Sequence, residues 1–431
     1  SVFTEINKVK ILKLKRRIGA MGIILFSGGR GNRNLLEAFS SDCSNKFPQI
    51  EVIINGLDDG ASTGAIRELF DNNVHGISDF LKVSLAMSDR KGLPSILEER
   101  FPNFECSEDY LSSSKDLYNF LFLDSELSIL KKYDKYDDIK TSVRGYILSF
   151  VEYFFIKNGN MINFGDYKIG NIVFASMLIE NNLNFQKSLD DFMKFCNIDL
   201  EKFSIIQSTE EISYLVGILK NGSLLPNEAA IVLTRVSDFI DQTFQISAPL
   251  SSKDIRDLCS KEHIDKKISL NRLQTIPKAS IEAVNAIKNS DAIIYGAGTP
   301  YSSLLPSLEL QGIADSICQT KCKKILVSNL IKETSNTLSV SDAIDGLMEF
   351  LKKSSDKAVE FKPENYITHV ILPSDHIDHA TLENAIKQDG DEIKRKYDWI
   401  TIIQSDIRSS VDFSKHDGAK LKKCLLETIR T

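Results

Sequence analysis

The sequence lacks any apolar run near the roughly 18 residues that a membrane-spanning helix needs. It also lacks an excess of positive charge, because 53 lysines and arginines stand against 59 aspartates and glutamates, a net charge of −6. A chain with no overall positive field is poorly suited to hold nucleic acid. We therefore expect a protein that binds neither a membrane nor nucleic acid.

Cysteine is sparse: seven cysteines, an odd number, are scattered over 431 residues. Extracellular disulfide frameworks use paired cysteines in short chains, so this pattern favours reduced thiols in the core of a cytoplasmic protein. The basic residues between positions 8 and 17 are not followed by an apolar signal core. We expect no secretory leader from that stretch.

What the sequence does contain is an alternation of short apolar runs with helical patterns. Strands that alternate with helices favour a parallel sheet covered on both faces. We predict an α/β fold, a three-layer Rossmann-like core whose mainly parallel sheet carries a helical insertion. The runs predicted to be strands of this one sheet are residues 22–26, 52–55, 291–295, 324–328 and 367–372.

Changes in composition divide the chain into four segments. Residues 1–90 read as the first part of a nucleotide-binding α/β core, and residues 91–160, with apolar residues at helical spacing, as the helical insertion. Residues 161–350 complete the core, and residues 351–431 form a C-terminal α/β extension.

Two local features fall within the third segment. Asn221 and Gly222 predict the tight turn of a hairpin. Residues 229–233 are apolar and read as one further strand, whereas residues 238–266 are polar and give no clear assignment.

The first strand runs into a glycine-rich turn and then a helix start. Such a turn places free N–H groups where an anion can bind, and glycine lets a phosphate approach the backbone. Tight packing is the competing explanation. The turn is neither a dinucleotide fingerprint, since Asn34 replaces the third glycine, nor a P-loop. Its residues are Ser27, Gly28, Gly29, Arg30 and Gly31.

The second strand ends in paired carboxylates, Asp58 and Asp59, which precede Gly60, Ser62 and Thr63. Adjacent carboxylates at a strand end, followed by small hydroxyl residues, suit a divalent cation and a second oxyanion. Alternatively, the pair caps a turn or helix, and Arg67 makes only a surface ion pair.

Other polar turns follow later strands and helices. Because ligands in parallel sheets sit outside the carboxyl ends of strands, these turns could converge on one crevice. Gly296 to Thr299 could also be an ordinary strand-to-helix turn. His376 and His379 resemble a metal pair but have no third ligand at readable spacing, so we interpret them as a polar loop. The candidate binding residues are Asn171, Gly296, Gly298, Thr299, Ser302 and Asn329.

The order of these turns resembles the 2-phospho-L-lactate transferase (CofD-like) superfamily, including its YvcK-type branch. The matching stretches are residues 27–31, 58–67, 169–171, 296–306, 328–330 and 340–342. The resemblance spans roughly residues 22–350 and shows four departures. Arg30 replaces the usual threonine of G-G-T-G, and residues 75–79, H-G-I-S-D, replace P-G-D-[IL]. The helical insert at 91–160 is unusually long, and residues 351–431 are not covered.

The resemblance implies a nucleotide-binding core. In the transferase branch, a guanosine-diphosphate-activated phospholactate or phosphoenolpyruvate is the donor, a deazaflavin alcohol attacks phosphorus, and GMP leaves. By this resemblance Asp59, with Asp58, would hold Mg²⁺, one of them would take the alcohol proton, and Arg67 or Arg30 would offset charge. The residues that would contact the nucleotide are Ser27, Gly28, Gly29, Arg30, Gly31, Ser62, Thr63, Asn171, Gly296, Gly298, Thr299, Ser302 and Asn329.

A non-catalytic function is the alternative. YvcK-like relatives resemble nucleotide-sugar-binding regulators, and the Asp-Asp-Gly-x-Ser-x-Gly turn at 58–64 is closer to their D-D-G-G-S-S-G. A scaffold with a decayed site is a third interpretation. The partner in the first two cases is a nucleotide or nucleotide-linked small molecule, and we expect a homodimer.

Overall fold

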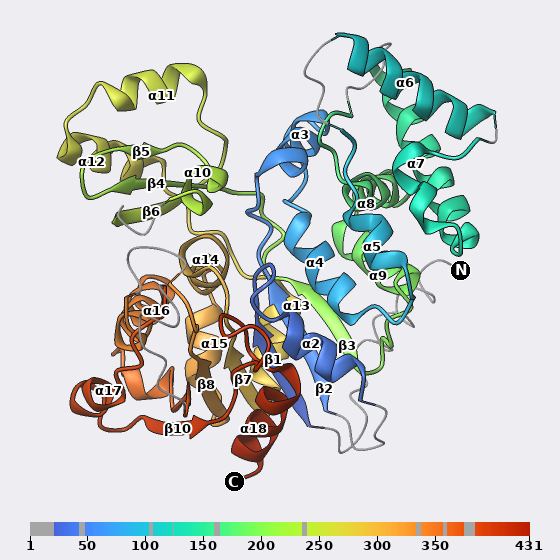
Figure 1. Ribbon diagram of the computed structural model, residues 1–431. Coiled ribbons are helices and arrows are strands. Elements are labelled where there is room, and N and C mark those ends of the chain that lie inside the picture. The colour runs from blue at the N-terminus through green and yellow to red at the C-terminus, as the bar shows by residue number, and fades with distance from the viewer. Residues whose placement is uncertain are drawn as a thin grey trace, which may run out of the picture.

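A seven-stranded parallel sheet lies at the centre of the computed structural model (Figure 1). Its strand order is β10-β9-β8-β7-β1-β2-β3, and every neighbouring pair is parallel. The five strands predicted for one sheet all lie in it, so the predicted α/β architecture is confirmed. The structure describes residues 21–42, 48–102, 107–123, 125–158, 164–234, 239–332, 338–356, 360–374 and 384–431. His376 and His379 lie outside these residues.

The strands are short and almost entirely apolar, as expected for strands covered on both faces. Their bounds are β1 Gly22–Phe26, β2 Gln49–Ile54, β3 Phe203–Gln207, β7 Ala292–Tyr295, β8 Lys323–Val327, β9 His369–Pro373 and β10 Thr401–Ser405. The last two strands extend the same sheet. Only β10, at the edge, has largely exposed or half-buried residues.

Alternating side chains of each strand feed two separate hydrophobic cores, because successive residues point to opposite faces. In β1, Ile23 and Leu25 join one core, and Ile24 and Phe26 join the other. The first core is covered by α2 Arg33–Ser40, α3 Ala61–Leu69, α4 Ser78–Met87, α8 Ile169–Glu180, α9 Phe185–Phe195 and α18 Gly418–Arg430. The second is covered by α13 Ile281–Lys288, α14 Leu305–Leu308, α15 Ile313–Gln319, α16 Val340–Ser354 and α17 Gly390–Lys396. The result is the predicted three-layer arrangement.

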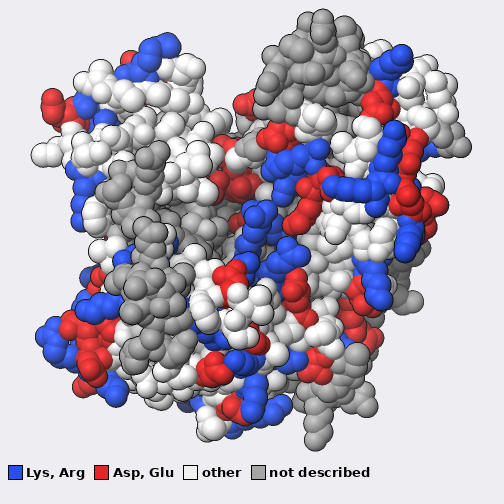
Figure 2. Space-filling view, in the orientation of Figure 1, with Lys and Arg blue, Asp and Glu red and all other residues white. Residues whose placement is uncertain are grey.

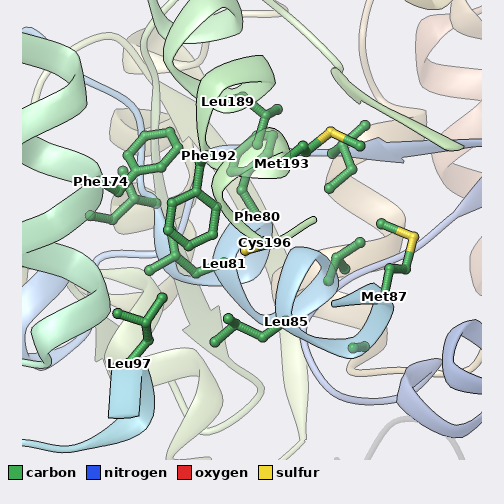
Figure 3. Packing of buried hydrophobic residues seen from close by; sticks show 14 of the residues in the cluster. Phe80, Leu81, Leu85, Met87, Leu97, Phe174, Leu189, Phe192, Met193 and Cys196 are labelled. Atoms are coloured by element: carbon green, nitrogen blue, oxygen red, sulfur yellow. The ribbon is translucent and has the colours of Figure 1, made fainter. Parts of the chain in front are cut away.

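The segment between residues 91 and 160 is helical, with α5 Leu93–Glu98, α6 Ser107–Phe122 and α7 Asp137–Asn158. Helix α7 buries one stripe at i, i+4, i+8, i+11 and i+15: Ile139, Val143, Ile147, Phe150 and Phe154. That stripe belongs to the same core as the sheet. Figure 3 shows the centre of this core, where Phe80 of α4, Phe174 of α8 and Phe192 of α9 meet.

A small antiparallel sheet, β4 Tyr214–Leu219, β5 Leu224–Leu225 and β6 Ile240–Ile246, forms a separate lobe with α11 Ser252–Cys259 and α12 His263–Leu273. The predicted hairpin at Asn221 and Gly222 joins β4 to β5, and Gly222 has a φ of +86°. The predicted strand at 229–233 is wrong. Residues 229–232 belong to helix α10 Glu228–Val232, and Leu233 is its C-cap residue. The Asn227 side chain caps the start of this helix by accepting from the Ala230 N–H.

No helix within the described residues is long and apolar enough to cross a membrane. The five cysteines in the described part of the chain are free thiols. Cys196 and Cys424 are buried in the core, but Cys259 on α11 is exposed, so the expectation of core thiols does not extend to every cysteine.

The strand order changes direction between β1 and β7. From β1 the chain builds outward through β2 to β3, and after the small lobe it starts again on the other side of β1 with β7. At such a switch point the helices that follow the two central strands pack on opposite faces of the sheet, which leaves a crevice for a ligand at the strand ends. The loops after β1 and β7 are therefore where a site is expected.

Candidate functional site

The loops that follow β1 and β7 are locked together by side chains and by close backbone contact. Asn32 donates from its Nδ2 to Ser27 Oγ and to the Ala297 carbonyl, both at 2.9 Å. A Cβ on Gly28 would lie 2.0 Å from Ser303 Cβ, and one on Gly31 would lie 2.3 Å from the Ala297 carbonyl oxygen. Packing between loops therefore already requires glycine at positions 28 and 31.

Gly29 differs from these two glycines. Its φ of +51° is left-handed, and a Cβ there would approach only the ends of two side chains, Asp79 at 3.2 Å and Lys82 at 3.8 Å. Of the three loop glycines, Gly29 alone combines a left-handed conformation with side-chain neighbours that carry charge. The loop thus meets charged groups of α4 at this position.

Asn329, after β8, holds the β7 loop on its other side. The Gly298 N–H donates to Asn329 Oδ1 at 3.1 Å, and Asn329 Nδ2 donates to the Gly298 carbonyl at 3.0 Å. His416, just before α18, lies with Nε2 3.0 Å from the Ser328 carbonyl, while Asn34 Nδ2 donates to the His416 carbonyl at 2.7 Å. The C-terminal segment therefore braces the same loops.

Four ionisable groups meet behind these loops: Asp58, Asp79, Lys82 and Glu228. Lys82 Nζ lies 2.8 Å from Asp79 Oδ1, and Ser303 Oγ donates to Asp79 Oδ2 at 3.2 Å. Burial, reinforced by the Asp79 charge, raises the pKa of Asp58 to about 6. Burial and the charges of Asp58 and Asp79 raise the pKa of Glu228 to about 8. The carboxyl groups therefore compete for protons and cations.

Asp58 is the member of this group with spare bonding capacity. Its residue is half-buried, but Oδ2 is enclosed and has no hydrogen-bond partner within the described structure. Gly76 packs on the Asp58 backbone, since a Cβ there would lie 2.1 Å from the Asp58 carbonyl oxygen. This contact accounts for glycine in the 75–79 segment.

Asp59 points to a different partner. Its Oδ1 lies 3.7 Å from Nη1 of Arg67, which is fully buried. Arg67 also donates from Nη2 to the Ser213 carbonyl at 3.0 Å and stacks over Tyr214, with 3.9 Å between Cζ and the ring centroid. Arg67 thus joins α3 to the small lobe, and it is not the surface ion pair that the sequence allowed.

The hydroxyl residues after Asp59 bind the start of α8. Asn171 Nδ2 donates to Ser62 Oγ at 2.8 Å and reaches Thr63 Oγ1 at 3.3 Å, and its own Oδ1 is buried without a partner among the described residues. Ser302 likewise has a buried Oγ with no hydrogen-bond partner among the described residues, and Thr299 immediately precedes its short helix, Pro300–Leu304. The predicted residues after β1, β2, β7 and β8 thus converge on one edge of the sheet.

Positive side chains gather beside the carboxylates. Burial lowers the pKa of Lys168, and so do the charges of Arg100, Lys82 and Arg30, while Glu98 acts in the opposite direction. Figure 2 shows a hollow between the small lobe and the α3–α4 side, with acidic atoms at its back and basic atoms along one wall. The hollow therefore presents negative charge at its back and positive charge along one wall.

A cavity of about 30 Å³ lies next to Gly298 and Asn329, walled by Tyr301, Leu305 and Leu347. A cavity of this size holds a few water molecules, so a base or sugar would enter only if the surrounding side chains moved. No group of three or more His, Cys, Asp or Glu side chains in the described ranges is arranged to hold a metal ion. A magnesium ion would depend on one or two carboxylates with ligand oxygens.

Several polar residues of this site were not predicted from the sequence: Asp79, Lys82, Lys168 and Glu228. Lys168 lies inside the Gly-rich 165–171 stretch, and Asp79 and Lys82 share the first turns of α4. These three carry a signal that a search for charges near the motifs could have found. Glu228 carries none, because it enters from the small lobe and only the fold brings it within 3.5 Å of the Asp59 N–H.

The parallel sheet, the reversal of strand order and the loops joined at its carboxyl edge define a Rossmann-like α/β protein with a ligand site at the switch point. A sequence model of the family "2-phospho-L-lactate transferase CofD" matches residues 23–408. The chain belongs to this family, as the motif order suggested.

Similar proteins include the "Gluconeogenesis factor" of Halalkalibacterium halodurans, 22% identical over 331 residues, which cover 76% of this chain and 73% of that protein. The "Gluconeogenesis factor" of Listeria monocytogenes is 39% identical over only 61 residues, 14% of this chain and 19% of that one. A crystal structure of a UPF0052 family protein from Bacillus halodurans superposes with a TM-score of 0.63 at 17% identity, covering 94% of this chain and 99% of that one. This last likeness concerns the fold.

The contact between the β1 and β7 loops predicts a coupled pair of substitutions. Gly28→Ala should cost about 1–3 kcal/mol of unfolding free energy, because its Cβ overlaps Ser303 Cβ. Adding Ser303→Gly should recover at least half of that loss. Gly145→Ala, in α7 with no atom within 4 Å of the new Cβ, is the control and should be neutral or stabilising. The measurement is a double-mutant cycle by urea unfolding. If the losses of unfolding free energy in Gly28→Ala and Ser303→Gly simply add in the double variant, the contact between the two positions is contradicted.

The buried guanidinium predicts a large stability effect. Arg67→Met should lower the free energy of unfolding by about 3 kcal/mol or more, because it removes a buried side chain that pairs with Asp59 and donates to the Ser213 carbonyl. Arg33→Met removes an exposed pair with Glu37 and should cost no more than about 1 kcal/mol. Equal costs in chemical denaturation would contradict the structural role of Arg67.

The raised pKa of Glu228 predicts how stability depends on pH. The folded protein holds this proton up to about pH 8, whereas the unfolded chain releases it near its ordinary value of 4.5, so stability falls as pH rises through that window. Glu228→Gln removes the effect. The melting temperature of the variant minus that of the wild type, measured in chelator, should become more positive from pH 5 to pH 8. A constant difference would show that the Glu228 carboxyl titrates normally.

Proposed function

We propose that this protein binds a nucleoside-diphosphate-linked ligand at the switch point and transfers its phospho-carboxylate group to an alcohol acceptor, with Mg²⁺. In this reaction the acceptor hydroxyl loses its proton and its oxygen bonds to the phosphorus that carries the carboxylate-bearing group. The bond from that phosphorus to the nucleoside monophosphate then breaks. The transferred group is of the phospholactyl or phosphoenolpyruvyl type, and a deazaflavin alcohol is the acceptor that family membership suggests.

The observation that carries this proposal is the Oδ2 of Asp58, which lies just past β2, is buried and has no hydrogen-bond partner among the described residues. A buried carboxylate oxygen without a partner is costly unless a cation or proton meets it. In our proposal a metal ion supplies that partner, and the phosphates that accompany it offset the charge of Lys82, which acts on Asp58. A turn-capping aspartate would instead have its oxygens hydrogen-bonded to backbone N–H groups.

Mg²⁺ fits this donor set through Asp58. The ion usually takes one or two protein carboxylates and completes its shell with water and phosphate oxygens, and when bound it would stabilise charge on the leaving phosphate. Asp79 is the carboxylate whose charge acts on Asp58 most strongly. Asp59 is engaged by Arg67, so in our proposal these two residues position the turn rather than touch the ligand. In our proposal the Gly29 turn and Lys82 hold the phosphate oxygens, because Lys82 Nζ would lie only 3.8 Å from a Cβ at position 29.

Nucleotide binding without chemistry is the second candidate, and the names of the relatives favour it. The two relatives cited above are named gluconeogenesis factors, a name that describes no transfer reaction. A binder would use the same loops and the same cations. The two functions differ only in whether the hollow accepts an acceptor alcohol beside the ligand.

The test compares wild type, Asp58→Asn and Asp59→Asn by calorimetric titration of GDP and UDP, in Mg²⁺ and in chelator. We expect Mg²⁺ to tighten binding to the wild type about tenfold, and Asp58→Asn to lose that gain while Asp59→Asn keeps most of it. Asparagine preserves size, so folding should change little. Identical curves for all three proteins would reject the site.

Release of GMP from a guanosine-diphosphate-linked phosphoenolpyruvate, with a deazaflavin alcohol present, then separates the two functions. We expect turnover by the wild type and a loss of at least a hundredfold in Asp58→Asn. Mg²⁺-dependent binding without any GMP release would establish the regulator and exclude the transferase.

A further inference from the structure

Helix α12 of the small lobe turns apolar side chains toward the solvent. Ile264 is 73% exposed and Ile268 is 44% exposed, and the two lie one turn apart on the same face of the helix. The buried side of the helix carries a lysine, Lys266, beside Leu270. This partly reverses the usual arrangement, in which a surface helix buries its apolar stripe and exposes its charges.

Polar contacts fix the helix in this orientation. Lys266 Nζ donates to the Gly222 carbonyl of the hairpin between β4 and β5. His263 Nε2 and Lys267 Nζ each lie 2.9 Å from Asp241 Oδ2 of β6. A rotation of α12 that buried the isoleucines would break all three contacts, so the exposure of the isoleucines belongs to the fold of the lobe.

Two charged side chains border the exposed isoleucines. Asp265 and Arg272 are exposed, and neither has an ion-pair partner among the described residues. They are seven residues apart, so they lie on the same side of the helix about 10 Å apart along its axis, with Ile268 about midway. Lys261, just before the helix, is engaged, because its Nζ donates to Ser269 Oγ at 2.8 Å. The exposed face therefore has a negative charge toward one end and a positive charge toward the other.

This face of α12 is complementary to itself. When two α12 helices pack antiparallel about a two-fold axis near Ile268, Asp265 of each copy lies opposite Arg272 of the other, and the two Ile268 side chains meet at the centre. A parallel pair about a two-fold axis would instead place each charge against its own like charge, and like charges repel. Charge complementarity therefore favours a second copy of this chain, in antiparallel orientation, as the occupant of the face.

We propose that α12 is the centre of a homodimer interface, in which two copies of this chain pack antiparallel through Ile264 and Ile268 and form two Asp265–Arg272 ion pairs. Figure 1 shows α12 on the outer side of the small lobe, remote from the loops after β1 and β7, so the interface uses none of the groups of the candidate ligand site. Two helices of 11 residues are too short to bury by themselves the roughly 1,200–2,000 Å² of a standard interface. We therefore expect a dissociation constant in the micromolar range.

Sedimentation velocity of the full chain, at concentrations from about 1 to 100 µM, measures this equilibrium. Asp265→Arg and Arg272→Asp should each weaken the wild-type dimer about tenfold or more, because each variant sets like charges opposite one another at both ends of the interface. The double variant Asp265→Arg/Arg272→Asp exchanges the charges and should return to within about threefold of the wild type. An equimolar mixture of the two single variants should also dimerise more tightly than either variant alone, since opposite charges then face each other.

The apolar part of the face is tested with a matched pair of substitutions. Ile264→Glu should weaken the dimer about tenfold or more, because it places a charge in the apolar centre of the contact. Ile281→Glu is the control, because Ile281 is 74% exposed but begins α13, outside this face. It should leave the dissociation constant within about twofold of the wild type. Both variants replace exposed side chains, so their melting temperatures should hardly change.

A wild-type protein that stays monomeric at about 100 µM would overturn the inference. Equal effects of Ile264→Glu and Ile281→Glu on a dimer would also overturn it, since the interface would then lie elsewhere. A double charge variant that dimerises no better than the single variants would overturn the antiparallel pairing. None of these outcomes bears on the proposed function, which is tested by nucleotide binding and GMP release.

Discussion

The site depends on how closely the loops after the two central strands approach each other. Gly28 and Gly31 lie against Ser303 and Ala297 at distances that leave no room for a side chain. Asn32 spans the same gap and binds both loops. Because these loops follow neighbouring parallel strands, their contact fixes the opening of the crevice that the reversal of strand order creates. Backbone packing therefore determines the geometry of these loops independently of the charged side chains.

Charge is then distributed over this frame by elements from distant parts of the chain. Asp58 follows β2, Asp79 and Lys82 come from α4, and Glu228 enters from the small lobe. Burying these carboxyl groups close to one another costs stability, as the raised pKa values of Asp58 and Glu228 indicate. Functional sites commonly retain such unfavourable arrangements because a ligand or metal ion relieves them. The buried Arg67 anchors the small lobe to α3 and so keeps this arrangement together.

The sheet was predictable because buried parallel strands leave continuous apolar runs, and those of β1, β2, β7, β8 and β9 are unmistakable. The error at residues 229–233 arose because five apolar residues fit a strand or a short helix equally well, and only the Asn227 cap decides between them. Glu228 could not be found from sequence, since its neighbours in space are more than a hundred residues away in the chain. For the same reason the sequence could not distinguish Asp58 from Asp59. Asp58 Oδ2 is buried without a hydrogen-bond partner among the described residues, whereas Asp59 lies beside Arg67, and this difference exists only in the fold.

The most direct measurement is anomalous diffraction from crystals of this protein grown with Mn²⁺ and a nucleoside diphosphate, since Mn²⁺ takes the oxygen ligands that Mg²⁺ takes. Our account predicts an anomalous peak within about 2.3 Å of Asp58 Oδ2, with phosphate oxygens completing the metal shell beside the Gly29 turn. Nucleotide bound elsewhere, or bound at this turn with Asp58 Oδ2 still without a metal ion, would contradict it.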